Sequence, residues 1–335
     1  MRRSMSREWT MPVRARTAGL TGVSPRAPWT LPRIGNSWAT SFSNDHSQMT
    51  MHAGELFELE LFGHRIEDRY RKMRPEVEAM PWGTMDLARL PEPVRLRARK
   101  RWTGAAFQEH RTGIACCTAL RALYECRAPV DLIALATRFP LDELVHVELC
   151  ARMAMEMGGG TEIRHDPDAM IVDPAADLRP LLRAADAIVR FFCVGEAVSI
   201  PLLRGAWHAA PHPLPRAILG RIVRDEAAHG TFGFTFLDWA IPQMTPEELA
   251  HLGRAADIAI RAVYRVWQGV AHPDDGDAEL DGNPLAWMGS PRYMQVAQHA
   301  MQRRVRAPLQ ARGIPLAGDR DAIARLDCLA DELAG

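Results

Sequence analysis

Lysine is almost absent from this 335-residue chain, and the formal net charge is zero. Of the 41 basic residues, all but Lys72 and Lys100 are arginine, and 41 acidic residues balance them. A domain that binds nucleic acid normally carries an excess of basic residues on one face. The composition does not indicate such an excess, so we expect no nucleic-acid partner and attribute the arginines to a compositional bias.

Cys-x-x-Cys motifs and long apolar runs are also missing. The six cysteines form no Cys-x-x-Cys pair, which excludes a rubredoxin-type iron centre and a zinc ribbon. Most of them lie within apolar helical patterns, as expected of reduced thiols in the cytoplasm. No apolar stretch is long enough for a signal peptide or a membrane span. The sequence therefore predicts a cytoplasmic protein with no membrane partner.

Acidic residues are scarce at the start of the chain. Residues 1–48 carry seven arginines and one glutamate, with Ser, Thr, Pro and Gly throughout. We interpret residues 1–50 as a disordered tail, with a transit peptide or a true start at Met49 or Met51 as alternatives. The remaining chain is divided into an N-terminal helical extension at 51–93, a central helical domain at 94–271 and a C-terminal helical extension at 272–335.

From residue 54 onward the pattern is helical. Proline and glycine occur in clusters, and apolar residues between the clusters are spaced three to four apart. With 47% hydrophobic and 24% charged residues, the chain can form a large all-α domain. Pro140 should kink or restart its helix, and Thr245 should cap the next one with Glu248. No strand is predicted, and helices are expected at 54–73, 94–127, 131–157, 178–209, 214–240, 246–271, 291–312 and 319–333.

The sequence Asp-Glu-x-x-His occurs twice, at residues 142–146 and 225–229. Residues three apart lie on one face of a helix, so the glutamate and histidine of each copy can point at the same metal ion. The motif ligands are Glu143 and His146 in the first copy and Glu226 and His229 in the second. Two copies are unlikely to occur by chance in a chain of this composition.

A single glutamate precedes each motif by about one helix length. Between Glu109 and the first copy lie 32 residues, and between Glu196 and the second copy lie 28; each glutamate interrupts an apolar stripe. A buried carboxylate needs compensation, and a metal ion supplies it. The alternative is pairing with arginines such as Arg111 or Arg204. The symmetry favours metal ligation, because four Glu and two His form the inward-facing set of a carboxylate-bridged dinuclear site.

The aspartates of the two motifs have a different expected role. Asp142 or Asp225 can accept the second imidazole proton of its own histidine or of the histidine in the other half, which fixes the tautomer and the ring direction. The alternative is a surface aspartate at a helix start. Small or apolar residues near the ligands are expected to line a substrate cavity: Gly113, Cys116, Cys150, Phe192 and Ser199.

The doubled signature resembles that of the ferritin-like non-haem diiron oxygenases, over roughly residues 94–240. The run 224–230 is most similar to the p-aminobenzoate N-oxygenases. The resemblance implies a ferritin-like four-helix bundle with additional flanking helices that binds two iron ions and activates O2. Manganese is compatible with one of the two positions.

This resemblance predicts an O2-dependent oxidoreductase, either a monooxygenase or an N-oxygenase-like enzyme, that oxidises a small organic substrate. An external electron donor is expected, and a homodimer is left open. No catalytic residue is expected beyond the metal ligands. Two alternatives stay open: an acyl-chain desaturase-like diiron enzyme, and a non-catalytic protein that binds the metals or senses oxidants.

Overall fold

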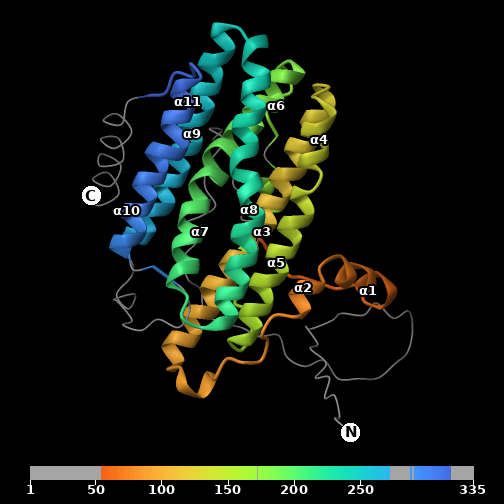
Figure 1. The fold of residues 1–335 in the computed structure, drawn as a ribbon, viewed down its shortest axis with the longest axis vertical. Helices are drawn as coiled ribbons and strands as arrows, with labels where there is room; N and C mark the ends of the chain where they lie inside the picture. The colour runs from red at the N-terminus through yellow and green to blue at the C-terminus, as the bar shows by residue number, and fades with distance from the viewer. Residues whose placement is uncertain (1–53, 172, 272–286, 289, 318–335) are drawn as a thin grey trace. The chain divides into compact units, whose positions relative to one another are not determined.

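The computed structural model describes residues 54–171, 173–271, 287–288 and 290–317. Helices account for most of these residues, and the all-α fold class is confirmed (Figure 1). The predicted N-terminal tail and the predicted helix 319–333 lie outside the described residues. The described chain divides into two compact units, one formed by residues 54–79 and 161–169, the other by residues 80–160 and 170–317.

The smaller unit contains the strands, which the sequence pattern did not predict. Strand β1 (Glu55–Leu56) pairs antiparallel with β2 (Arg164–His165). Helix α1 (His64–Met73) begins only after Gly63, whose φ of 81° lies in the left-handed region. The prediction of one helix over 54–73 is therefore wrong for its first half. A short helix, α2 (Pro75–Glu78), follows.

The larger unit contains the long helices. Among its described residues the elements are η1 (Leu87–Arg89), α3 (Glu92–Glu125), α4 (Val130–Ala136), α5 (Phe139–Glu156), η2 (Asp168–Met170, which straddles the boundary between the units), α6 (Pro180–Ile188), η3 (Val189–Glu196), α7 (Ala197–Ala209), α8 (Pro213–Ala240), η4 (Ile241–Gln243), α9 (Pro246–Ala271), α10 (Ser290–Ala300), η5 (Met301–Arg306) and α11 (Ala307–Ala311). Helix α3 packs along α5, and α8 packs against α5, α7 and η3 (Figure 1).

Two helix starts follow from the local sequence. The helix predicted over 131–157 is broken, because α4 ends at Ala136 and α5 restarts at Phe139 with Pro140 in its first turn. Proline lacks an amide proton, and the first turn is where that proton has no helical acceptor. At α9 the predicted capping box is present: Thr245 N donates to Glu248 Oε2 at 2.9 Å, and Glu248 N donates to Thr245 Oγ1 at 3.3 Å.

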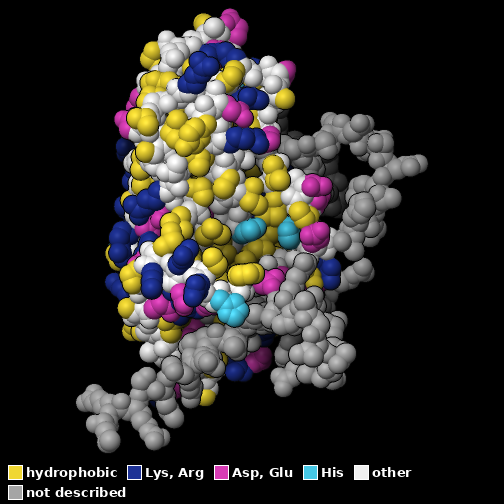
Figure 2. Space-filling model, turned by 90° about the vertical axis from the view of Figure 1, so that its right-hand side faces the viewer, with side chains coloured by type: hydrophobic (Ala, Val, Ile, Leu, Met, Phe, Trp, Pro, Cys, Tyr) yellow, Lys and Arg dark blue, Asp and Glu magenta, His cyan; other side chains and the backbone are white. Residues whose placement is uncertain are grey.

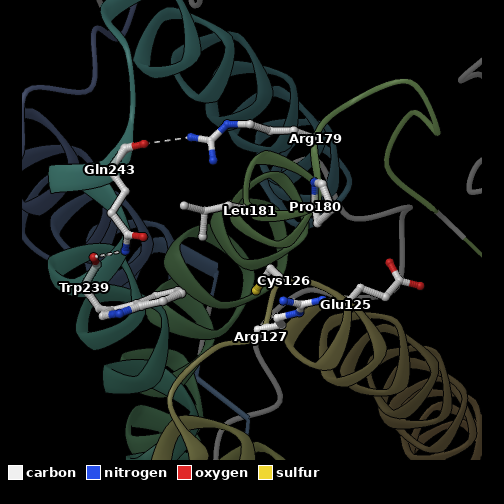
Figure 3. A pocket seen from close by; sticks show the side chains of 8 residues that line it. All are labelled: Glu125, Cys126, Arg127, Arg179, Pro180, Leu181, Trp239 and Gln243. Atoms are coloured by element: carbon white, nitrogen blue, oxygen red, sulfur yellow. Dashed lines mark hydrogen bonds between the residues drawn. The ribbon is translucent and has the colours of Figure 1, made fainter.

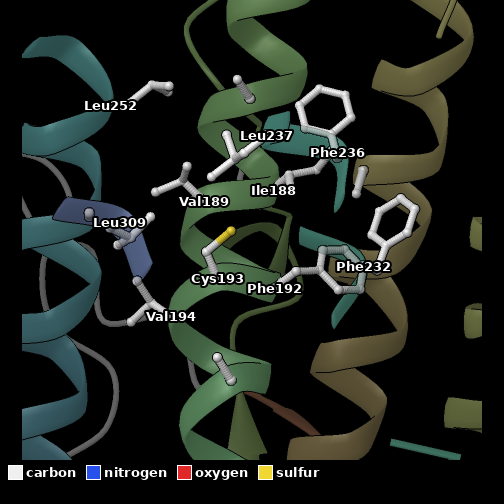
Figure 4. Close-up of a cluster of buried hydrophobic side chains, with 14 of the residues drawn as sticks. Ile188, Val189, Phe192, Cys193, Val194, Phe232, Phe236, Leu237, Leu252 and Leu309 are labelled. Atoms are coloured by element: carbon white, nitrogen blue, oxygen red, sulfur yellow. The ribbon is translucent and has the colours of Figure 1, made fainter. Parts of the chain in front are cut away.

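The segment η3 is a π-helix in the middle of the run from α6 to α7. Its apolar side chains Val189, Phe192 and Val194 are buried in the core, where η3 packs against α8, α9 and η5 (Figure 4). Helix α8 approaches it closely at Gly233, where an added Cβ would lie 2.8 Å from Phe192 Cβ and 2.7 Å from Cys193 Sγ. The core therefore fixes the position of η3, whose last residue is Glu196.

Candidate metal centre

Six side chains that the sequence predicts as ligands come together in the larger unit. They come from four helical segments: Glu109 from α3, Glu143 and His146 from α5, Glu196 from η3, and Glu226 and His229 from α8. Their ligand atoms form two groups, and within each group the atoms all lie within 4.8 Å of one another. The cluster is largely buried, and it could hold a metal ion.

The two groups share Glu143 and Glu226. Glu143 Oε2 lies 3.3 Å from His146 Nδ1, and its Oε1 lies 3.0 Å from His229 Nδ1. Glu226 mirrors this arrangement, with Oε1 3.3 Å from His146 Nδ1 and Oε2 3.1 Å from His229 Nδ1. Each of these carboxylates therefore lies within 3.3 Å of both histidines.

The other two glutamates belong to one group each. Glu109 Oε2 lies 3.9 Å from His146 Nδ1, and Glu196 completes the group of His229. Glu196 also accepts a hydrogen bond from Ser199 Oγ at 3.5 Å. Arg111 donates to Gln108 instead, and within the described residues neither ligand glutamate pairs with an arginine. The alternative of simple arginine pairing is therefore wrong.

Several buried atoms of the cluster have no hydrogen-bond partner. They include Glu143 Oε1, Glu226 Oε2 and His229 Nδ1, which face one another. Buried polar atoms are nearly always satisfied, and an exception requires an explanation such as a missing ion. A metal ion between these oxygens and this nitrogen would satisfy all of them. The residues present thus fit a metal ion.

The outward-facing histidine nitrogens meet the motif aspartates of the opposite half. His146 Nε2 lies 3.2 Å from Asp225 Oδ2, and His229 Nε2 lies 3.7 Å from Asp142 Oδ2. Both aspartates are buried. The reach to the other half was one of the two predicted arrangements, and the alternative of a surface aspartate does not hold for either residue.

Two arginines that the sequence interpretation missed hold these aspartates. Arg138 Nε lies 2.9 Å from Asp142 Oδ2, and its Nη2 lies 3.5 Å from Asp225 Oδ1. Arg221 Nη1 also pairs with Asp225. The sequence spacing could have predicted these pairs, because each arginine lies four residues before its aspartate, on the same helical face. The full repeat is therefore Arg-x-x-x-Asp-Glu-x-x-His.

Burial and mutual repulsion control protonation in the metal-free cluster. Burial and the nearby charge of Glu143 hold the pKa of Glu109 well above its usual range, and burial and Glu226 do the same for the pKa of Glu196. Burial also acts to raise the pKa of Glu226, but its close contacts with both imidazoles outweigh burial and lower that pKa.

The histidines respond to the same carboxylates in the opposite direction. Burial disfavours the charged imidazole, yet the hydrogen bonds of His146 to Glu143 and Glu226 raise its pKa well above the usual value. Contacts with Asp142, Glu143 and Glu226 likewise outweigh burial and raise the pKa of His229 to about 12. Without metal, both imidazoles therefore carry protons that compete with metal binding.

The predicted cavity residues take several positions around the cluster. A Cβ at Gly113 would lie 3.4 Å from Glu143 Cβ. Cys116 and Cys150 are buried, and burial together with the neighbouring carboxylates raises the pKa of each thiol well above its usual value. Phe192 packs against the rings of Phe139 and Phe232. Their role in binding a substrate stays a prediction.

A separate pocket of about 370 Å³ lies where the C-terminal end of α3 meets the start of α6 and the end of α8 (Figure 3). None of the predicted cavity residues lines it. Arg179 closes one side by donating to the backbone oxygen of Gln243 at 2.8 Å. The pocket is lined by Glu125, Cys126, Arg127, Arg179, Pro180, Leu181, Trp239 and Gln243.

The surface gives no further assignment. On the face drawn in Figure 2, basic and acidic side chains are intermingled with apolar ones. Within the described residues, no helix combines the length and the apolar character needed to cross a bilayer. No protein-family model matches the chain, and no curated protein is significantly similar to it.

Proposed function

We propose that the protein is a ferritin-like non-haem diiron oxidoreductase that uses O2 to oxidise a small organic substrate, as a monooxygenase or N-oxygenase-like enzyme. The proposal rests on one observation: two largely buried ligand groups share Glu143 and Glu226, and each group contains one histidine. Two groups that share two carboxylates suit a pair of adjacent ions better than two independent ions.

Charge and ligand type support iron in both positions, with manganese as an occupant of one. The four glutamates carry four negative charges when ionised, and two divalent ions balance them. The two aspartates are balanced separately by Arg138 and Arg221. Carboxylate oxygens with imidazole nitrogens are ligands that Fe and Mn accept, whereas the site offers no thiolate among its ligand atoms.

When bound, two adjacent irons supply the electrons that O2 reduction needs. The chain's own task is to position groups and to exclude water. Glu143 and Glu226 would be shared by the two ions, and the aspartates orient the histidines. The buried thiols of Cys116 and Cys150 remain protonated beside the carboxylates, so they do not compete as thiolate ligands.

The proposed reaction requires partners beyond the chain. O2, a small organic substrate and an external electron donor are the minimum set, and a homodimer is compatible with the site. Five described cysteines are free thiols, which supports a reducing, cytoplasmic setting.

A second candidate is a non-catalytic protein that binds two metal ions or senses oxidants. Close packing around part of the cluster favours it: Phe192 and Cys116 belong to the buried core, and the pocket of Figure 3 is lined by other residues. Reactivity with O2 in the presence of substrate separates the two candidates, because only an enzyme couples O2 consumption to product.

Metal content is the first test. Protein purified from iron-replete cells is expected to hold about two iron ions per chain, as a four-Glu, two-His set accommodates. Glu143→Ala should reduce this content, because it removes a ligand from both positions. Arg111→Ala is a matched control on the surface of α3 and should keep both ions. Zero iron in the wild-type protein, or full iron content in a Glu109→Ala/Glu226→Ala double variant, would refute the site.

Turnover is the second test. The reduced, iron-loaded protein is supplied with O2 and with panels of amines, fatty acids and aromatic compounds, and oxygenated products are measured by mass spectrometry. A product that contains an oxygen atom from labelled O2 supports the oxygenase. Slow O2 uptake that no substrate class accelerates would instead favour the non-catalytic protein.

A further inference from the structure

The two ligand groups are supported unequally from outside the cluster. Asp225, which contacts His146, pairs with both Arg138 and Arg221. Asp142, which contacts His229, pairs with Arg138 alone among the described residues. The half of the site that contains Glu109 and His146 therefore has two guanidinium groups behind it, and the half that contains Glu196 and His229 has one.

The exposure of the two arginines adds to this difference. The side chain of Arg221 is 12% exposed, whereas that of Arg138 is 58% exposed. A pair between a buried carboxylate and a mostly exposed guanidinium is weakened by water and by salt more than a buried pair is. The contact of Arg138 with Asp142 is the shorter of its two contacts, 2.9 Å against 3.5 Å to Asp225. Arg138 thus acts mainly on the His229 half.

The distance from each aspartate to its histidine follows the same order. Asp225 Oδ2 lies within hydrogen-bond distance of His146 Nε2, at 3.2 Å, whereas Asp142 Oδ2 lies 3.7 Å from His229 Nε2. A carboxylate that accepts the outer imidazole proton fixes the ring and makes the inner nitrogen a better ligand. His146 is therefore held more firmly than His229.

We propose that Arg138 is a positioning residue that determines whether the second metal position is filled. The metal position of Glu109 and His146 binds the tighter ion, and the position of Glu196 and His229 binds the weaker ion and depends on Arg138 through Asp142. This inference rests on the dinuclear centre of the proposed function, but it does not require that the centre reacts with O2.

The experiment uses Mn2+ as a redox-stable probe on the full-length, metal-free chain. Wild-type protein should take up about two Mn2+ per chain in two steps. Arg138→Gln should weaken the second step by up to roughly 10-fold, the lower end of the effect of losing a direct partner of a ligand histidine, because Arg138 is mostly exposed and acts on His229 only through Asp142. Arg111→Gln is the control, because Arg111 donates to Gln108 and not to an aspartate of the site, and it should retain both ions. Arg138→Lys should restore the second step in part.

Paramagnetic resonance identifies the lost ion. Two adjacent Mn2+ ions couple magnetically, so Arg138→Gln at a Mn2+ level that saturates the wild type should show the hyperfine-split signal of an isolated Mn2+. Adding Glu109→Ala to Arg138→Gln should abolish that signal, and adding Glu196→Ala should leave it. Circular dichroism establishes that each variant is helical before titration.

The outcomes separate the two hypotheses. If wild-type protein binds no metal, both the proposed function and this inference fail. If wild-type protein binds two ions and Arg138→Gln binds them with unchanged affinities, the dinuclear centre stands and this inference is wrong. Loss of both ions together, or survival of the ion at Glu196 rather than at Glu109, would also overturn it.

Discussion

Substitution of Gly233 is the most direct test of whether core packing holds the candidate ligand Glu196 in place. It lies in α8, opposite η3, and a methyl group there would meet Phe192 Cβ at 2.8 Å, Cys193 Sγ at 2.7 Å and Cys193 N at 3.0 Å. Two of these atoms belong to stiff parts of the neighbouring segment, so they cannot move without moving η3. Since Glu196 ends η3, Gly233→Ala should displace a metal ligand.

The expected magnitude combines two opposing effects. Overpacking a close helix contact costs about 1–3 kcal/mol, and replacing glycine by alanine inside a helix returns up to ~1 kcal/mol. The backbone contact favours the upper part of the first range, so the net destabilisation is about 1–2 kcal/mol. For a unit of this size, that corresponds to a midpoint of thermal unfolding lowered by roughly 2–8 °C.

Gly104→Ala provides the matched control. Gly104 lies inside α3, and a Cβ there would meet nothing within 4 Å. This variant should be stabilised by ~0.5–1 kcal/mol. Thermal unfolding of metal-free protein and iron content of loaded protein are measured for both variants. Equal stabilisation of the two, with full iron content in Gly233→Ala, would refute the reasoning that packing against α8 holds Glu196.

Three further outcomes are expected. Binding of Mn2+ to metal-free protein should release about two to four protons per chain and strengthen as pH rises, because both ligand histidines and two of the glutamates hold protons that the metal displaces. Calorimetry in buffers of different ionisation enthalpy measures the number of protons released. A metal affinity that does not change with pH would contradict the prediction. Gly113→Leu should lower the iron content, whereas Gly113→Ala should keep it. A Cβ at this position lies in ordinary contact with Glu143, and a branched side chain would displace that glutamate. Full iron content in Gly113→Leu would show that Glu143 can move aside without losing the metal. No stable tyrosyl radical should form after O2 is added. Tyr124, the tyrosine on α3, is 60% exposed and lies about 22 Å along the helix from Glu109, at 1.5 Å rise per residue. A persistent tyrosyl signal in paramagnetic resonance would point to a reductase-like centre.

The ligand cluster could be predicted because its pattern is local. Glu143 and His146 share a helical face by spacing alone, and Glu109 stands out as a carboxylate in an apolar stripe. The repetition of the pattern, with one glutamate about a helix length before each motif, then indicated which helices meet. The all-α class followed from the same periodicity and is confirmed.

Other features depend on contacts between distant segments and left no local pattern. The π-helical form of η3 coincides with close packing against α8, and nothing in the sequence of 189–196 distinguishes it from an α-helix. Residues 54–63 carry apolar residues at helical spacing, yet β1 pairs with a strand more than a hundred residues later. The contact of Arg138 with both aspartates also requires the three-dimensional arrangement, although its position four residues before Asp142 was visible.

The crossed pairing of histidines and aspartates makes the two halves of the chain interdependent during assembly. Neither half of the cluster, Glu109 with the first motif or Glu196 with the second, contains all the candidate ligands of one group, since Glu143 and Glu226 each contact both histidines and each histidine contacts the aspartate of the opposite motif. An ion captured by one half alone would meet too few ligands to be retained. In the proposed dinuclear protein, metal loading would therefore require that the segments on either side of residues 157–179 have docked, and it would stabilise contacts that form slowly because they are distant in sequence.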